Sequence, residues 1–251
     1  MNAYEHLIRQ SDHFVYIENQ FFISSCDVEG TTIQNRIGDA LVERIERAFE
    51  NGDKWRACIV IPLMPGFQNS VDSQDGSSIR LIMQCQYRSI CRGDRSIFGR
   101  LRQKGIEPRD YIEFYALRQW GKIGPTKSLT TEQLYIHAKC MIVDDRACII
   151  GSANINERSM LGNRDSEVAC VVTDQQTVPS FMGGKPYEVG AFPHTLRMRL
   201  MREHLGIDVD EYYSRNQNEA EAGLAVDPVL EEIGRKSVSY THLTLPTIYS
   251  V

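Results

Sequence analysis

Residues 135–167 read Y-I-H-A-K-C-M-I-V-D-D-R-A-C-I-I-G-S-A-N-I-N-E-R-S-M-L-G-N-R-D-S-E, and this stretch decides the fold. Its first part, 135–143, is short, apolar and β-branched toward its end, which predicts a strand. Because side chains alternate along a strand, His137 and Lys139 should lie on one face, roughly 6–7 Å apart. The opposite face is expected to be core and carries Ile136, Ala138, Cys140 and Ile142.

A second strand should start at Ala147, after a short turn, and end at about Asn154. If the hairpin loop has two or four residues, Lys139 pairs with Ser152 and His137 pairs with Asn154. Directly opposed residues share a face about 5 Å apart, so an imidazole, an ammonium, a hydroxyl and a carboxamide would gather there. A three-residue loop would place Ser152 and Asn154 on the other face, so this prediction depends on the register.

These groups are the donors that a tetrahedral oxyanion needs, together with one side chain, His137, that titrates near neutral pH. Gly151 would let a substrate approach the backbone closely. We expect Asp144, which has the opposite parity to His137, to be a structural turn or a buried anchor. Glu167 begins a further expected strand, 167–173, and is the candidate carboxylate that orients His137.

The simpler interpretation is a buried histidine and a solvated lysine in an ordinary hairpin, and a lone H-x-K would favour it. Here H-x-K-x4-D is followed at a fixed offset by G-S-x-N. At about 5% usage per residue, the joint pattern should arise by chance in roughly a few chains per million. The pattern therefore indicates a catalytic site.

Composition limits the class of protein. The chain has 251 residues, 42% of them hydrophobic, which is enough for an ordinary core. A formal net charge of −5 provides no global basic field that would recruit nucleic acid. The seven cysteines form no C-x-x-C pair, which indicates free thiols in a reducing compartment, and their spacing from the histidines suggests no metal site.

Targeting and membrane-spanning signals are not visible in the sequence. The N-terminal M-N-A-Y-E-H-L-I-R-Q has neither a basic n-region nor an apolar h-region, and no apolar run reaches the length of a bilayer span. We therefore expect a cytoplasmic protein that, if its substrate is a lipid, meets the membrane peripherally.

Helices and strands alternate along the rest of the chain. Hydrophobic periodicity predicts helices at 2–11, 32–51, 78–91 and 194–204, and strands at 14–18, 55–61 and 111–117. The segment 119–131 is expected to be a loop that carries Trp120 and overhangs the site. Because the catalytic strands form a hairpin, the sequence predicts an α/β fold with a mixed β-sheet sandwiched between helices.

Basic residues are in local excess between residues 80 and 109, where only Asp94 and Glu107 oppose them. In an acidic protein such an excess could face anionic lipid, where each cation contributes about 1 kcal/mol. We favour the simpler interpretation, a solvated helix face.

Four segments resemble one known family. The pattern His137-x-Lys139-x4-Asp144-x6-Gly151-Ser152-x-Asn154 is similar to the signature of the phospholipase D superfamily. The sequence of residues 150–167 resembles the second catalytic block of the eukaryotic, phosphatidylcholine-hydrolysing members of this superfamily. So do Y-I-E-N-Q-F-F-I at 16–23, I-P-L-M-P-G-F at 61–67 and Q-Y-R-S-I-C-R-G at 86–93. The resemblance runs from about Asn2 to about Leu230.

The resemblance implies a fold, a site and a reaction. The fold is one half of a pseudo-two-fold pair in which two H-x-K-x4-D sets meet. The histidine of the first set forms a phosphohistidine, and His137, in the second set, is the general acid and then the base. Lys139, Ser152 and Asn154 would neutralise the phosphate oxygens without a cofactor or metal. The products are phosphatidate and choline, or a phosphatidyl group transferred to a primary alcohol.

The resemblance also implies binding residues and partners. Glu18, Asn19 and Gln20 would lie near the headgroup pocket, although a polar turn is an equally good interpretation of these three residues. The implied partners are a phospholipid bilayer surface, an N-terminal half that carries the first set, and an anionic phosphoinositide, with no nucleic acid.

We expect a catalytic half-domain at 1–213, a polar extension at 214–236 and a non-native tail at 237–251, which has no Asp, Glu, Lys or Arg. The single set within this sequence leaves two rivals: a single-motif nuclease or phosphodiesterase acting as a homodimer, and a non-catalytic membrane adaptor. A symmetric dimer active on DNA would favour the first. The presence of every expected site group speaks against the second.

Overall fold

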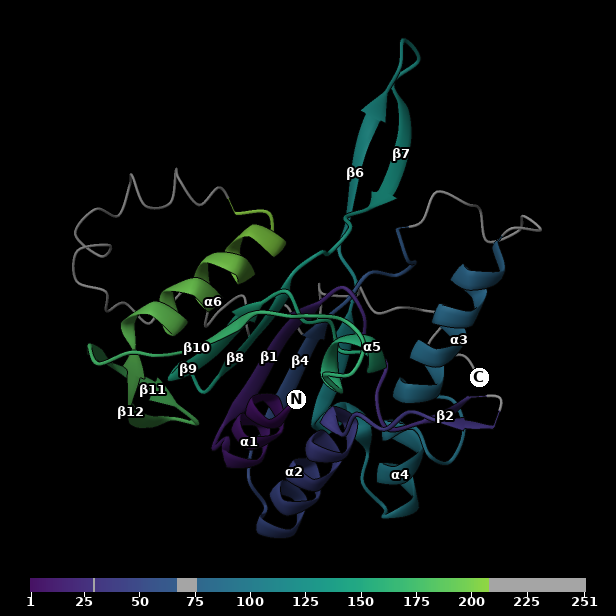
Figure 1. The fold of residues 1–251 in the computed structure, drawn as a ribbon. Coiled ribbons are helices and arrows are strands. Elements are labelled where there is room, and N and C mark those ends of the chain that lie inside the picture. The colour runs from purple at the N-terminus through teal and green to yellow at the C-terminus, as the bar shows by residue number, and fades with distance from the viewer. Residues whose placement is uncertain (29, 67–75, 208–251) are drawn as a thin grey trace.

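The computed structural model describes residues 1–28, 30–66 and 76–207 (Figure 1). The expectations for the extension at 214–236 and the tail at 237–251 lie outside these residues. The described residues form a central sheet with helices on both faces.

A six-stranded sheet occupies the centre of the fold, in the order β10-β9-β8-β1-β4-β5. The strands β1, β4 and β5 are parallel neighbours, whereas β8, β9 and β10 pair antiparallel and β8 is also antiparallel to β1. The sheet is therefore mixed, as predicted. The strand bounds are β1 Phe14–Asn19, β4 Arg56–Val60, β5 Ile112–Tyr115, β8 Lys139–Val143, β9 Ala147–Gly151 and β10 Ala169–Thr173.

Helices cover both faces of this sheet, and a separate apolar cluster seals each face. The larger cluster packs β1, β4, β5 and β8 against α1, α2 and α4; α2 contributes Leu41 and Ile45, whose helical spacing puts them on one side. The smaller cluster packs Tyr16 and Ile142 against Leu196 of α6. The predicted α/β sandwich is confirmed. The helix bounds are α1 Asn2–Gln10, α2 Ile37–Asn51, α3 Ser77–Ile90, α4 Ile97–Gln103, α5 Glu157–Met160 and α6 Ala191–His204, with a short 3₁₀ turn at Pro108–Asp110.

Three two-stranded ribbons stand apart from the main sheet. They are β2–β3 (Asp27–Val28 and Thr31–Thr32), β6–β7 (Arg118–Ile123 and Ser128–Gln133) and β11–β12 (Thr177–Met182 and Lys185–Gly190). The expectation of a loop at 119–131 is therefore wrong, because β6 and β7 pair along their whole length. Within the described ranges, no helix is both long enough and apolar enough to cross a bilayer.

Candidate active site

The turn between β8 and β9 fixes the register of the whole site. Asp144 and Asp145 both have a left-handed φ, and the Arg146 N–H donates to the Val143 carbonyl over 2.9 Å. The first registered pair is Val143 with Ala147, which leaves three residues in the loop. The expected two- or four-residue loop is therefore wrong. The expected pairing of His137 with Asn154 and of Lys139 with Ser152 is wrong as well, because a shift of one residue in register turns every side chain of the strand to the opposite face of the sheet.

Ser152 is consequently bound to the neighbouring strand rather than turned toward Lys139. Its hydroxyl donates to the Glu167 carboxylate and accepts the Val168 N–H over 3.0 Å. The other oxygen of Glu167 accepts from the Ser159 hydroxyl over 2.5 Å. The expectation that Glu167 orients His137 is therefore not met: this carboxylate ties the loop after β9 to the start of β10.

Gly151 has a structural reason that sequence reasoning missed. A Cβ at this position would lie 2.5 Å from the Ala169 Cβ and from the Val168 carbonyl oxygen. Only glycine lets β9 approach β10 this closely, so the expected approach of a substrate is not what requires a glycine here.

Lys139 lies at the end of the sheet where β8 begins, opposite Asn19 of β1. Its ammonium donates to the Gln20 side-chain oxygen over 2.9 Å and to the His137 carbonyl over 2.6 Å. Partial burial lowers the pKa of Lys139, and the Glu167 charge opposes that shift. The cation is held in place by neutral oxygens, so its charge remains available to an anion.

His137 precedes β8 instead of forming part of it, so the predicted strand over 135–143 begins four residues too early. The ring is exposed, stacks on Tyr135 with centroids 6.4 Å apart, and has no hydrogen-bond partner in the described part of the chain. Tyr135 accepts from the Gln20 amide over 2.8 Å and lies against Gly66, where a Cβ would come within 2.7 Å of the ring. An imidazole with no hydrogen bond to the described residues therefore lies two residues before Lys139, whose ammonium is held in place.

Asn154 and Asn19 lie in adjacent segments, because Asn19 Oδ1 accepts the Ile155 N–H over 3.1 Å and the Phe21 N–H over 3.2 Å. The Asn19 amide nitrogen and the Asn154 side-chain oxygen are both buried and unbonded among the described residues. Buried polar atoms without partners are uncommon, so this end of the sheet retains unused hydrogen-bonding capacity.

The three residues Glu18, Asn19 and Gln20 do not gather at one pocket. Glu18 faces α6, where its carboxylate accepts from the Tyr16 hydroxyl and binds His204 Nε2 over 2.6 Å. Asn19 is buried and secures the neighbouring segments, and only Gln20 reaches Lys139. Alternating facing along β1 separates Glu18 from Asn19, and Gln20 lies beyond the end of the strand, so the three residues do not form the single polar cluster that we expected.

Asp144 and Asp145 anchor the far end of β8. Asp144 is 5% exposed and accepts three backbone N–H groups at the start of β1, from Asp12, His13 and Phe14. Burial raises the pKa of this carboxyl, and the three backbone donors oppose the shift. The structure supports the anchor role expected for Asp144, which touches no other candidate residue.

Asp145 is a second buried anchor, which the sequence did not lead us to predict. It is fully buried and binds Arg197 of α6 with both oxygens at 2.6 Å, and His194 Nδ1 at 2.7 Å. Burial, the largest single effect, would raise its pKa, but the charge and hydrogen bonds of Arg197 together with those of His194 outweigh it, and the pKa of Asp145 is lowered overall. The two consecutive aspartates in the turn were the sequence feature that could have indicated a second anchor.

Metal-ligating side chains do not cluster in the described ranges: no three His, Cys, Asp or Glu gather there. The cysteines are free thiols, in agreement with the expectation of an unlinked chain. The groups at this edge that could meet an anion are the Lys139 ammonium, the His137 imidazole and the unpaired Asn19 amide nitrogen.

Comparison with known proteins identifies the family to which the chain is similar. A family model described as phospholipase D matches residues 1–221. The chain is 60% identical over 217 residues to phospholipase D1 of Schizosaccharomyces pombe, covering 86% of this chain and 16% of that protein. It is 46% identical over 205 residues to phospholipase D1 of Homo sapiens, covering 81% and 19%. The chain thus spans less than a fifth of the length of these two relatives.

Among solved structures, the chain is similar to Nuc from Salmonella typhimurium, described as a phospholipase D family member. The identity is 15% and the TM-score 0.39, over 82% of this chain and 86% of that chain.

Proposed function

Because this chain belongs to the phospholipase D family, we propose that it supplies one half of a phosphodiesterase site that hydrolyses phosphatidylcholine to phosphatidate and choline. One observation carries this proposal: at one end of the sheet, the Lys139 ammonium binds the backbone carbonyl of His137, whose exposed ring has no hydrogen-bond partner among the described residues. In this proposal the protein binds peripherally to the cytoplasmic side of a bilayer, where the site can reach the lipid headgroups.

Lys139 neutralises the anionic oxygens of the phosphodiester, which otherwise repel a nucleophile. The unused Asn19 amide nitrogen is a further candidate donor to these oxygens, whereas the unused Asn154 side-chain oxygen is an acceptor and could bind a water molecule. Gln20 positions the ammonium, since it accepts from Lys139 while donating to Tyr135.

His137 transfers the proton. In the first step a histidine nitrogen of the first H-x-K set attacks phosphorus, and the bond from phosphorus to the choline oxygen breaks. His137 gives its proton to that oxygen. In the second step His137 takes a proton from water, the water oxygen bonds to phosphorus, and the phosphorus–nitrogen bond breaks. A primary alcohol in place of water gives the transphosphatidylation product.

The first set has to come from outside the described residues, because in-line displacement needs groups on both sides of phosphorus. The histidines on α6 are engaged elsewhere, His194 by Asp145 and His204 by Glu18. We propose that an N-terminal half with the first motif supplies this set.

The test measures choline release from soluble short-chain phosphatidylcholine by the full chain, alone and with a separately produced segment that carries the first set. Turnover should require both parts. His137→Asn should lower the rate by about 10²–10⁴-fold, because no other group replaces the imidazole. The control is His6→Asn, the same change at an exposed position of α1, which should leave the rate unchanged.

Near-normal release by His137→Asn would overturn the assignment. Robust release by a monomer of the chain alone would overturn the half-site. Hydrolysis of DNA confined to a symmetric dimer would favour the single-motif nuclease, and absence of turnover under every combination would favour the adaptor.

A further inference from the structure

The β6–β7 hairpin projects away from the body of the molecule (Figure 1). All of its strand residues are exposed except Gly121 and Gln133, which are half-buried. Three of its large apolar side chains face solvent: Trp120 and Leu129 are each 70% exposed and Ile123 is 60% exposed. A two-stranded ribbon is marginal in water by itself, and apolar side chains gathered on one are typical of a contact surface.

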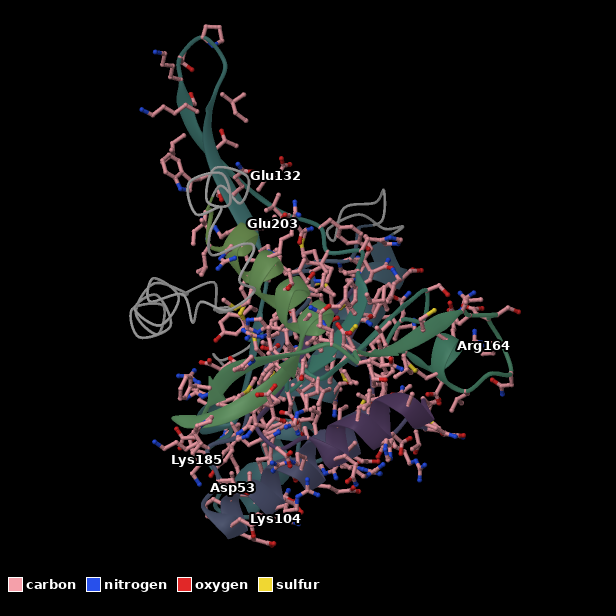
Figure 2. The ribbon with its side chains drawn as sticks, turned by 90° about the vertical axis from the view of Figure 1, so that its left-hand side faces the viewer. Asp53, Lys104, Glu132, Arg164, Lys185 and Glu203 are labelled. Carbon is pink, nitrogen blue, oxygen red and sulfur yellow. The ribbon has the colours of Figure 1, made fainter. Side chains whose placement is uncertain are left out.

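The charge of the hairpin is opposite to that of the chain. Lys122 is directly opposite Leu129 and Trp120 is opposite Thr131, so Trp120, Lys122 and Leu129 share one face. Arg118 and Lys127 add two further cations at the base and the tip. Glu132, the single acid of the two strands, is opposite Gln119, on the other face and toward the base (Figure 2). The hairpin is therefore basic within a chain of net charge −5.

The other basic region of the chain differs from the hairpin because several of its cations are paired with acidic side chains. Between residues 80 and 109, three of the cations form ion pairs with acids of β2 and α2: Arg95 with Asp27, Arg100 with Asp39, and Lys104 with Glu46. This pairing supports the interpretation of that region as a structural and solvated surface. Within the described ranges, Lys122 and Lys127 form no such pair, and Arg118 contacts only the Thr131 hydroxyl, over 3.3 Å.

The base of the hairpin is fixed to the candidate active site. Gln133 accepts from the Met64 N–H over 3.1 Å and donates to the Met64 carbonyl over 3.3 Å. The Leu134 N–H donates to the Leu117 carbonyl over 2.9 Å, and the chain then runs through Tyr135 to His137. Six residues per strand at about 3.4 Å each give the hairpin a reach of roughly 20 Å from this base.

We propose that the β6–β7 hairpin docks the protein onto an anionic phospholipid surface, with Trp120 and Leu129 of one face and Ile123, beside the turn on the other face, at the level of the headgroups. The three cations would lie against the lipid phosphates. The inference rests on the proposed function, since it places a lipid substrate beside His137. Tryptophan at the headgroup level with flanking lysine and arginine is the composition of membrane-interface anchors. A protein partner would be expected to bury the strands, whereas cations interspersed among apolar groups match the charge of an anionic bilayer.

The chain provides its own reporter for this contact. It has two tryptophans, and Trp55 is fully buried with its indole N–H bonded to the Ser11 hydroxyl over 2.8 Å. Only Trp120 can therefore respond to lipid. Vesicles of phosphatidylcholine mixed with phosphatidylserine should shift the tryptophan emission of the full chain to shorter wavelength, and brominated lipid should quench it. Trp120→Phe should remove both responses and retain the signal of Trp55.

Binding to the same vesicles, measured by co-sedimentation, tests the contributing groups. The combined change Arg118→Ala, Lys122→Ala and Lys127→Ala should weaken binding roughly a hundredfold, at about fivefold per cation. Ile123→Ser with Leu129→Ser should weaken it as well. The matched control is Phe181→Ser, which changes a 62% exposed apolar residue on the other exposed ribbon, β11–β12, and should leave binding unchanged.

Three results would overturn the proposal: an emission shift retained by Trp120→Phe, vesicle binding unaffected by the hairpin changes, or equal loss in the Phe181→Ser control. Dissociation of a dimer by the hairpin changes, without loss of vesicle binding, would show a contact with a second copy instead. Circular dichroism of each variant checks that the substitution has not unfolded the protein. Failure of the proposed function is distinguishable, because vesicle binding needs no turnover and choline release from soluble substrate needs no bilayer.

Discussion

Replacement of Asp144 by asparagine should lower the stability of the fold without altering the chemistry at His137. Asp144 Oδ1 accepts the N–H groups of His13 and Phe14, both over 2.8 Å, and Oδ2 accepts that of Asp12 over 2.6 Å. An asparagine has one side-chain oxygen, so it can keep two of these bonds at most. Its amide group must then face the third N–H, donor against donor.

The expected cost follows from this count. Hydrogen bonds to a charged group contribute roughly 1.5–3 kcal/mol each. Loss of one bond, together with loss of charge on the remaining two, should cost about 2–4 kcal/mol. For a chain of this size that corresponds to a fall in Tm of roughly 4–16 °C. Asparagine enters the left-handed region readily, so the φ of +51° at this position adds little to the cost.

Thermal unfolding followed by circular dichroism measures the effect, and hydrogen exchange at residues 12–14 localises it. Asp144→Ala should cost more, because alanine loses all three bonds and adds about 1–2 kcal/mol of backbone strain at a left-handed φ. The control is Asp53→Asn, at an exposed carboxylate, which should change the free energy of unfolding by less than about 0.5 kcal/mol. An unchanged Tm and unchanged exchange, with a collapse of turnover in the complemented enzyme, would refute the anchor role.

Three further outcomes are expected. Asp145→Asn leaves the Arg197 cation without its buried partner and should cost about 3 kcal/mol. Because the folded-state pKa of Asp145 is lowered, the stability that this carboxylate contributes is present above about pH 4 and is lost as the pH falls toward the folded pKa. Denaturation curves of the variant should therefore lack this loss of stability at acid pH. Gly151→Ala forces a Cβ to within 2.5 Å of Ala169 and should cost about 1–3 kcal/mol, whereas Gly121→Ala, which meets nothing within 4 Å, should be nearly neutral in the same urea titration. Choline release from soluble substrate should survive chelation of transition metals, and restoration of a chelated, inactive enzyme by zinc would contradict the assignment of charge neutralisation to Lys139.

The architecture could be predicted from the sequence because it depends on periodicity. The helix of α1, the amphipathic helix of α2 and the buried strands β1 and β4 each carry an apolar pattern that has one solution. The mixed sheet followed from recognising a hairpin at 135–154. The β6–β7 hairpin has no buried face, so it lacks the alternation by which an exposed ribbon could be distinguished from a loop.

The facing of the site residues could not be predicted in the same way, because it depends on a single turn. Two consecutive left-handed aspartates leave three residues in the β8–β9 loop, and a loop of two or four would have reversed Ser152. Residue chemistry predicted the anchoring of Asp144, which its three backbone hydrogen bonds support, whereas the role of Lys139 stays a prediction. It failed for Glu167, because the partner of a carboxylate is chosen by the register and not by the sequence distance.

The spacing H-x-K-x4-D has a physical explanation in the strand between its parts. Lys139 begins β8 and Asp144 follows its last residue, so the two side chains are roughly 17 Å apart at about 3.4 Å per residue. Asp144 fastens the far end of β8 to the start of β1, and Asn19, at the end of β1, is opposite Lys139. Two strands joined at one end therefore determine where the ammonium lies at the other. The aspartate acts on the site through the rigidity of the β1–β8 pair, so a loss of stability should precede any change in the geometry around His137.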